Sequence, residues 1–188
     1  FSGSLAWLGI LIYTCQIFLD FSGYTDMAIG VAQMLGIFLP ENFTSPYTAG
    51  SVTEFWNRWH MTLSRWLRDY IYIPLGGSRS SQNRVLFNVM VVFTLSGLWH
   101  GTGLQYLVWG LYHGTWVILE RIGRLKNIQL PNWLGIPFTF LVVMVGWIFF
   151  RSPSLAYAAK YLLAMLTFKT GWTAPLSVAI LLDNRFYF

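Results

Sequence analysis

The residue whose type and position most directly suggest chemistry is His100, one of three histidines in the chain. It ends the apolar run 86–99 and is followed by the Gly-Thr-Gly sequence 101–103. On a helix, Asn88, Ser96 and His100 share one sector of an otherwise apolar surface. Such a polar stripe typically faces a bundle interior or a wet tunnel, which indicates a catalytic role. The alternative is a structural histidine bonded to a neighbouring carbonyl.

His60 lies within the polar and aromatic segment 51–70 (SVTEFWNRWHMTLSRWLRDY). At helical spacing it shares a face with Trp56 and Leu63, so its ring is expected to point into packing rather than into water. Taken from the residues alone, this pattern favours a buried, hydrogen-bonded histidine over a catalytic one.

The remaining polar residues in apolar sequence have structural explanations. His113 precedes Glu120 by about two helical turns, and a structural contact between them is expected. Asp20 and Asp26 are expected to pair with arginines or to cap backbone near Gly23, and contact with a substrate is the alternative. Three histidines without clustered carboxylates, and Cys15 as the only cysteine, predict no metal site and no disulfide. Cys15 is expected to contribute packing.

The composition places these residues in a membrane protein. Of the 188 residues, 55% are hydrophobic and only 10% charged, whereas soluble domains carry about 25% charged residues. A water-soluble globule, a disordered chain and a coiled coil are therefore excluded. The net charge of +5 suits an anionic membrane face or a phosphate-bearing ligand better than nucleic acid. The chain begins at Phe1 without a signal-type n-region, so we expect one membrane-embedded segment, 1–188, of a longer protein.

Spanning the hydrocarbon core takes about 20 apolar residues, and the apolar runs predict an all-α, polytopic transmembrane bundle. Acids and a glycine within 20–26 predict a break, and Pro40 ends the run that follows it. The predicted last run reads as interfacial or as the start of a further helix, and the run before it is short for a full span. The predicted helical runs are 5–19, 21–39, 84–99, 104–119, 136–150 and 155–168.

Between these runs, the segment 51–70 predicts one amphipathic helix at the membrane boundary or at the wet end of the bundle. Ser51 or Thr53 would cap it, with Glu54 in the first turn. It ends before the Ile-Pro-Leu-Gly-Gly turn 73–77. The densest basic stretch is placed on the cytoplasmic side, and a second basic cluster would return to that side through a helical hairpin. The two clusters are Arg58, Arg65, Arg68, Arg79 and Arg84, and Arg121, Arg124 and Lys126.

Several of these motifs together resemble the membrane-bound O-acyltransferase family, over about Phe18 to Glu120. The similarity is densest with the bacterial branch that acetylates polysaccharides such as alginate. Members are more than twice as long as this chain, which agrees with the expectation of a longer protein. The matching motifs are FLDFSGYTDMAIG (18–30), LPENF (39–43), FWNRWHMTLSRWLRDY (55–70), IPLGG (73–77) and GLWHG (97–101).

The resemblance implies roles for two histidines. His100 matches the family's hallmark histidine and would act as general base on an acceptor hydroxyl, since the ordinary imidazole pKa of about 6.5 lies near working pH. His60 matches the upstream polar position and would orient a thioester or stabilise its developing oxyanion. The donor would be acetyl-CoA or another acyl thioester arriving from the cytoplasm, with no bound cofactor.

Further site residues follow from the same resemblance. Arginines pair with phosphate in fork geometry, so part of the basic stretch is predicted to bind the donor. The alternative is that these arginines only set the membrane orientation through the positive-inside rule. Aromatic and polar side chains are predicted to line the tunnel; packing in a bundle is their alternative. The predicted donor-binding residues are Arg58, Arg65, Arg68 and Arg79, and the predicted tunnel-lining residues are Trp56, Asn57, Ser96 and Trp99.

The resemblance implies an O-acyltransferase of the bacterial cytoplasmic (inner) membrane. It would pass an acetyl group towards an exported polysaccharide with an extracytoplasmic acetyltransferase as its partner, and lipid around it. One alternative within the same chemistry is D-alanyl transfer to teichoic acid. A transporter or a scaffold without chemistry is the alternative from another class.

Overall fold

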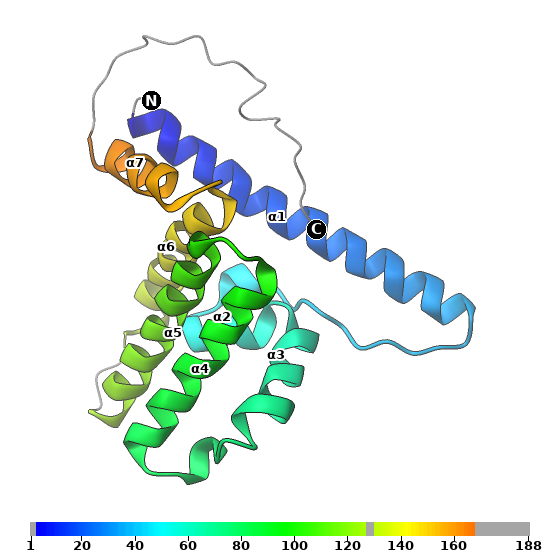
Figure 1. Ribbon diagram of the computed structural model, residues 1–188. Helices are drawn as coiled ribbons and strands as arrows, with labels where there is room; N and C mark the ends of the chain where they lie inside the picture. Colours follow the sequence, from blue (N-terminus) through cyan, green and yellow to red (C-terminus); the bar gives the residue numbers. More distant parts are fainter. Residues whose placement is uncertain (1–2, 127–129, 168–188) are drawn as a thin grey trace.

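The computed structural model describes residues 3–126 and 130–167, and every regular element within them is helical (Figure 1). This confirms the all-α prediction. The part of the predicted last run at Phe168, and Lys169 beyond it, lie outside the described residues. The main helices are α1 (Gly3–Met34), α2 (Val52–Arg58), α3 (Met61–Leu67), α4 (Gln82–His100), α5 (Leu104–Leu125), α6 (Asn132–Arg151) and α7 (Leu155–Leu166). Short turns of helix are η1 (Pro46–Thr48), η2 (Arg68–Tyr72) and η3 (Gly77–Arg79).

Helix α1 is continuous, so the predicted break within 20–26 is wrong. Ser22 and Thr25 donate their hydroxyl hydrogens to carbonyls one turn earlier, at 3.4 and 2.9 Å. Their side chains therefore bond within the helix and do not compete with the helical hydrogen bonds of the backbone. Asp20 and Asp26 lie exposed on the helix, and neither pairs with an arginine among the described residues, contrary to expectation. The C-terminal half of α1 extends beyond the bundle (Figure 1).

The predicted helix 51–70 is interrupted at Trp59 and His60, where the chain leaves α2 and enters α3. Trp59 is extended, and His60 adopts the left-handed conformation with φ 45° and ψ 53°. The backbone N–H of Met61 donates to the carbonyl of Asn42 at 3.0 Å, and that of Thr44 donates to the carbonyl of Arg58 at 3.0 Å. Partners on a distant loop therefore replace the bonds that a continuous helix would have made.

Ser51 and Glu120 hold the N-terminus of α2. The Glu54 backbone N–H donates to Ser51 Oγ at 3.1 Å, which confirms Ser51 as the cap. Glu120 on α5 accepts bonds from the backbone N–H groups of Val52 and Thr53 and from the Thr53 hydroxyl. A carboxylate at a helix N-terminus also meets the positive end of the helix dipole. Glu120 therefore fixes α2 against α5. The contact between Glu120 and His113 that the sequence predicted is not formed.

Helices α4 and α5 form an antiparallel hairpin with very close backbones. A Cβ added at Gly97 would collide with the carbonyl of Tyr106, and one added at Gly110 would collide with the carbonyl of Phe93. One at Gly114 would lie 3.0 Å from the Phe93 side chain. Small residues at such contacts let membrane helices approach. The hairpin returns the chain to the end where it began, as predicted.

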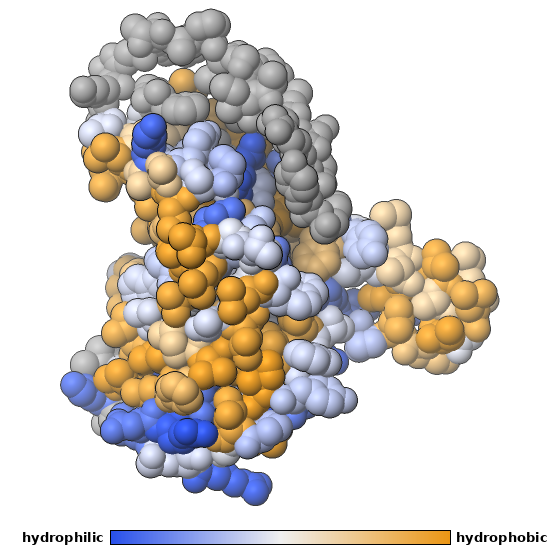
Figure 2. Space-filling model, viewed as in Figure 1, coloured by the Kyte–Doolittle hydropathy of each residue, from blue (hydrophilic) through white to orange (hydrophobic). Residues whose placement is uncertain are grey.

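The basic residues gather at that end. Arg84 lies in the first turn of α4 and Arg124 in the last turn of α5, and both are exposed. Figure 2 shows hydrophilic side chains at the lower end of the bundle, where α4 begins and α5 ends, below a largely apolar face. This separation of charge from apolar surface is typical of a membrane boundary.

Buried aromatic rings form the centre of the fold, where α2, α5 and α6 meet. Trp59, Trp109 and Trp147 are each at most 3% exposed, and Trp109 and Trp147 stack with their ring centroids 6.2 Å apart. By length and apolar composition, α1 and the 133–151 part of α6 could each cross a membrane. Helix α6 is thus longer than the predicted run 136–150.

Replacing Gly110 with alanine is expected to separate α4 from α5. The added methyl meets backbone that cannot rotate away, and overpacking of this kind costs about 1–3 kcal/mol. Thermal unfolding in detergent, followed by circular dichroism, measures the loss. Gly30→Ala on α1 is the matched control, because nothing lies within 4 Å of its added Cβ. An equally stable Gly110→Ala protein would contradict close contact between the α4 and α5 backbones.

Candidate active site

One cavity of about 190 Å³ lies between α2, α3, α4 and α5, and both His60 and His100 line it. The two histidines are separated by 40 positions in the sequence and come from different elements. The other lining residues are Thr53, Trp56, Asn57, Trp59, Leu63, Ser64, Leu67, Phe93, Ser96 and Val117. Apolar surface predominates in the walls, and six of the twelve lining residues are polar or ionisable, which together suit a small-molecule site.

His60 is positioned by Asn42, a loop residue that is 5% exposed. Asn42 Oδ1 accepts hydrogen bonds from the backbone N–H of Thr62 at 3.2 Å and from the Thr62 hydroxyl at 2.9 Å. The same oxygen lies 3.2 Å from His60 Nδ1. With the Met61 N–H on its carbonyl, Asn42 contacts three consecutive residues at the start of α3.

These bonds determine where the His60 ring carries its proton. The backbone N–H of Thr62 can only donate, which identifies the Asn42 atom as the amide oxygen and not the nitrogen. An oxygen can only accept from Nδ1, so Nδ1 is protonated. In the neutral ring, Nε2 then carries a lone pair. Donation to an oxyanion from Nε2, one of the two roles predicted for His60, would need the charged imidazolium.

The surroundings of His60 keep the ring uncharged. Burial lowers the pKa of His60 from its ordinary 6.5 to about 4, because an apolar environment disfavours the charged form. Phe21 of α1 meets the ring edge-on, with centroids 4.9 Å apart at 85°. At neutral pH the ring is therefore a neutral hydrogen-bond acceptor.

His100 is held by ring contacts instead of hydrogen bonds. Trp109 and Phe150 meet its ring edge-on, with centroids 5.1 and 5.0 Å away, and Trp99 lies at 4.9 Å. Neither ring nitrogen has a hydrogen bond to any residue in 3–126 or 130–167. The His100 side chain lines the cavity.

Three of the four predicted tunnel-lining residues line this cavity: Trp56, Asn57 and Ser96. Trp99 does not line it. Its side chain is 64% exposed, and it contacts the rings of His60 and His100 from outside, at 6.3 and 4.9 Å. The helix end turns Trp99 outwards because its neighbour His100 faces the cavity.

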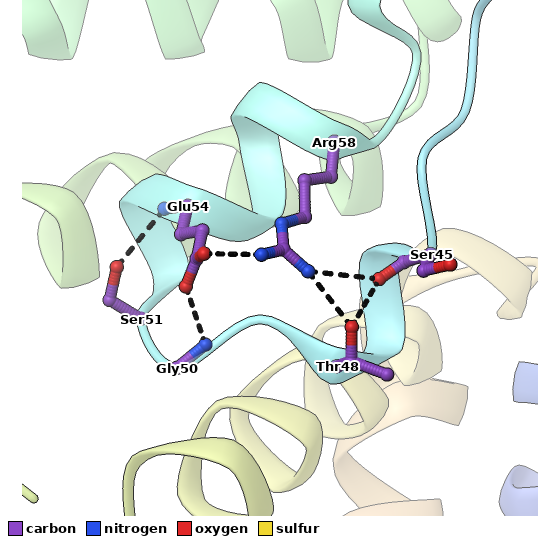
Figure 3. A network of polar contacts seen from close by, with 6 residues as sticks. All are labelled: Ser45, Thr48, Gly50, Ser51, Glu54 and Arg58. Atoms are coloured by element: carbon purple, nitrogen blue, oxygen red, sulfur yellow. Dashed lines mark hydrogen bonds and ion pairs between the residues drawn. The ribbon is translucent and has the colours of Figure 1, made fainter. Parts of the chain in front are cut away.

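Arg58, predicted to bind the donor, is engaged in a network beside α2 (Figure 3). Its guanidinium lies 2.6 Å from Glu54 Oε1 and donates to Thr48 Oγ1 at 2.8 Å and to the Ser45 carbonyl at 3.4 Å. Glu54 Oε2 accepts the backbone N–H of Gly50 at 2.7 Å. The network ties the loop around η1 to α2, so Arg58 serves the local fold.

The other predicted donor-binding arginines are exposed and dispersed. Arg65 lies on α3 and Arg79 on η3, and Arg68 pairs with Asp69 at 2.8 Å. The arginine that contacts the cavity wall is one that the sequence did not single out for this role. Arg124 donates to Thr53 Oγ1 at 3.1 Å, and Thr53 lines the cavity.

His113 lies outside the cavity, fully buried against Trp56 and Trp109, whose ring centroids are 5.0 and 5.3 Å away. Its two ring nitrogens have no hydrogen-bond partner among the described residues. Cys15, expected to pack, is exposed on α1. No group of three potential metal ligands converges within the described ranges.

Asn42 was missed as a site residue, although it belongs to the Leu-Pro-Glu-Asn-Phe motif 39–43. The signal available in the sequence was an amide directly after Pro40 and Glu41 in an apolar region. Its partner is 18 positions away, so no local pattern connects the two residues.

With this geometry in place, comparison with known proteins assigns the chain to a class. The model of the membrane-bound O-acyltransferase family matches residues 1–159. The chain belongs to this family, which confirms the resemblance recognised in its motifs, and it is a membrane protein.

The relatives are more specific. The chain is 48% identical over 172 residues to the probable alginate O-acetylase AlgI of Azotobacter vinelandii, covering 89% of this chain and 34% of the relative. It is 43% identical over 165 residues to the peptidoglycan O-acetyltransferase of Helicobacter pylori, covering 86% and 31%. Identity to the teichoic acid D-alanyltransferase of Bacillus subtilis is 41% over 155 residues, covering 74% and 39%. The chain thus spans about a third of the length of these relatives.

Arg58→Ala is expected to lower the free energy of unfolding by about 1–2 kcal/mol, because it removes hydrogen bonds that link the loop to α2. The affinity for a phosphate-bearing donor is expected to stay unchanged. Thermal unfolding and donor titration measure the two effects. The control Arg65→Ala changes an exposed arginine on the neighbouring helix and should stay within about 0.5 kcal/mol. A weakened donor affinity with unchanged stability would instead support the prediction that Arg58 binds the donor.

Proposed function

We propose that this chain carries the catalytic site of an acyltransferase that passes acetyl groups from a cytoplasmic thioester towards an exported polysaccharide. The observation that carries the proposal is the joint presence of His60 and His100 in one largely apolar cavity. The family and the O-acetylating relatives support the reaction type.

In the proposed reaction, His100 takes the proton of the acceptor hydroxyl as the oxygen attacks the thioester carbonyl. The C–O bond forms, the C–S bond breaks, and the proton passes on to the departing thiolate. A general base in position contributes roughly 10²–10⁴-fold to the rate. The edges of Trp109 and Phe150 exclude water from the His100 ring, which limits hydrolysis of the thioester.

The donor is proposed to enter from the basic end of the α4–α5 hairpin. Gly114 packs at the level of Phe93 and Met90, and the lining residue Val117 lies one turn further towards that end. The cavity therefore extends from His100 towards the end that carries Arg124. Acetyl-CoA, the proposed donor, carries phosphates that arginines bind well. Exposed Arg65, Arg68 and Arg79 remain candidates for the same role.

The positive-inside rule orients this end towards the cytoplasm. We therefore propose a multi-pass protein of the bacterial inner membrane, surrounded by lipid, whose acceptor side faces out of the cell. An extracytoplasmic acetyltransferase is the proposed partner that completes transfer to the polysaccharide.

Replacing His100 with alanine is expected to lower polysaccharide acetylation by about 10²–10⁴-fold, the contribution of a general base. The assay uses the protein expressed from its complete gene in bacterial membranes and measures acetate released from the polymer by mild base. Thr115→Val on α5 is the control, since its hydroxyl donates to the Leu111 carbonyl of its own helix and it does not line the cavity. Acetylation at the unaltered rate in a folded His100→Ala protein would overturn the proposal.

The same assay separates the alternative suggested by the D-alanyltransferase relative. Mild base releases acetate in one case and D-alanine in the other. Release of D-alanine, dependent on His100, would retain the acyl transfer and replace the acetyl group.

A further inference from the structure

The break between α2 and α3 is built around one side chain that the proposed chemistry has not used. Asn42 lies in the loop after α1 and is almost fully buried. Its Oδ1 is shared by Thr62 N, Thr62 Oγ1 and His60 Nδ1, at 3.2, 2.9 and 3.2 Å. A loop that only needed closing would not require its buried amide oxygen to face an imidazole.

We propose that Asn42 is a positioning residue of the active site. By accepting the Nδ1 proton of His60, it holds that ring in one tautomer and presents Nε2 to the cavity as a hydrogen-bond acceptor. The inference deepens the proposed function and rests on it: within that reaction, His60 orients a substrate by accepting a hydrogen bond and does not donate one to an oxyanion.

The geometry gives Asn42 control over both the direction and the tautomer of the ring. The left-handed backbone of His60, at φ 45°, is uncommon for a residue other than glycine. The bonds from Met61 and Thr62 to Asn42 hold the adjoining backbone in place. The hydrogen bond on one ring nitrogen sets the state of the other, so backbone and side chain are fixed by the same residue.

An amide differs from a carboxylate here in one respect that can be measured. A carboxylate beside Nδ1 would favour the imidazolium, whereas a neutral amide oxygen orients the ring without charging it. The groups that face His60 are Phe21 from α1, Thr62 from α3, and His100 and Trp99 from α4. Of these described neighbours, His100 carries the one other ionisable side chain.

The tautomer is read by ¹⁵N NMR of protein labelled on histidine, expressed from its complete gene and held in lipid nanodiscs. The His60 signals are assigned by their loss in His60→Gln. At neutral pH the unaltered protein is expected to show a protonated Nδ1 and an unprotonated Nε2. Protonation at Nε2 instead would overturn the inference. This readout needs no turnover. The tautomer of His60 can therefore be determined even if the proposed acetyl transfer is not observed.

Two substitutions of Asn42 separate positioning from simple stability. Asn42→Asp keeps an acceptor oxygen for Thr62 and His60, so the fold and the tautomer are expected to persist. The protonation midpoint of His60 should then move upwards from about 4, and the acid limit of acetylation should move up with it. Asn42→Ala should mix the tautomers and lower turnover roughly ten- to hundredfold, as loss of a ring-orienting partner does elsewhere.

Tyr47→Phe is the matched control. It removes the hydrogen bond from Tyr47 to the Thr14 carbonyl, at 2.6 Å, which ties the same loop to α1 without touching His60. It is expected to lower stability and to leave both the tautomer and the pH profile unchanged. If Asn42→Asp titrates like the unaltered protein, or if Tyr47→Phe shifts the profile equally, Asn42 is only a structural residue and the inference is wrong.

Discussion

The arrangement of the site depends on the hydrogen bonds that replace helical ones between α2 and α3. Asn42 and Thr44, on a loop, satisfy backbone groups of Met61 and Arg58 that a continuous helix would have paired internally. A buried backbone group without a partner costs free energy comparable to a lost hydrogen bond. The break is therefore tolerated only because the loop supplies its partners, and it is this break that turns His60 into the cavity.

Around this break, aromatic packing forms the core, and close helix contact places His100. The buried rings of Trp59, Trp109 and Trp147 form the core, and Trp109 also supplies the edge that holds His100. The glycines between α4 and α5 bring two backbones together so that His100, at the end of α4, lies beside α5. Glu120 fixes the start of α2 to the same helix. Helix α5 therefore supports the elements that carry both imidazoles.

Charge and polarity follow a second pattern, along the length of the hairpin. Arg84 and Arg124 lie at one end of the hairpin, and His100 lies at the other. Arg58 shows that a basic residue within this region need not serve the ligand, since Glu54 and Thr48 already satisfy it. Arg124, by contrast, is bonded to the cavity wall at Thr53.

The sequence by itself determined the helical class, the membrane environment and the family, because composition, local spacing and motif are all written along the chain. It also predicted His60 and His100 as site residues, and the structure brings the two into one cavity. It could not determine the continuity of α1, where Ser22 and Thr25 bond back within the helix. Nor could it decide the break at His60, the partner of Glu120 or the role of Asn42. Those depend on hydrogen bonds between residues 14 to 68 positions apart, and such partners exist only once the helices have packed.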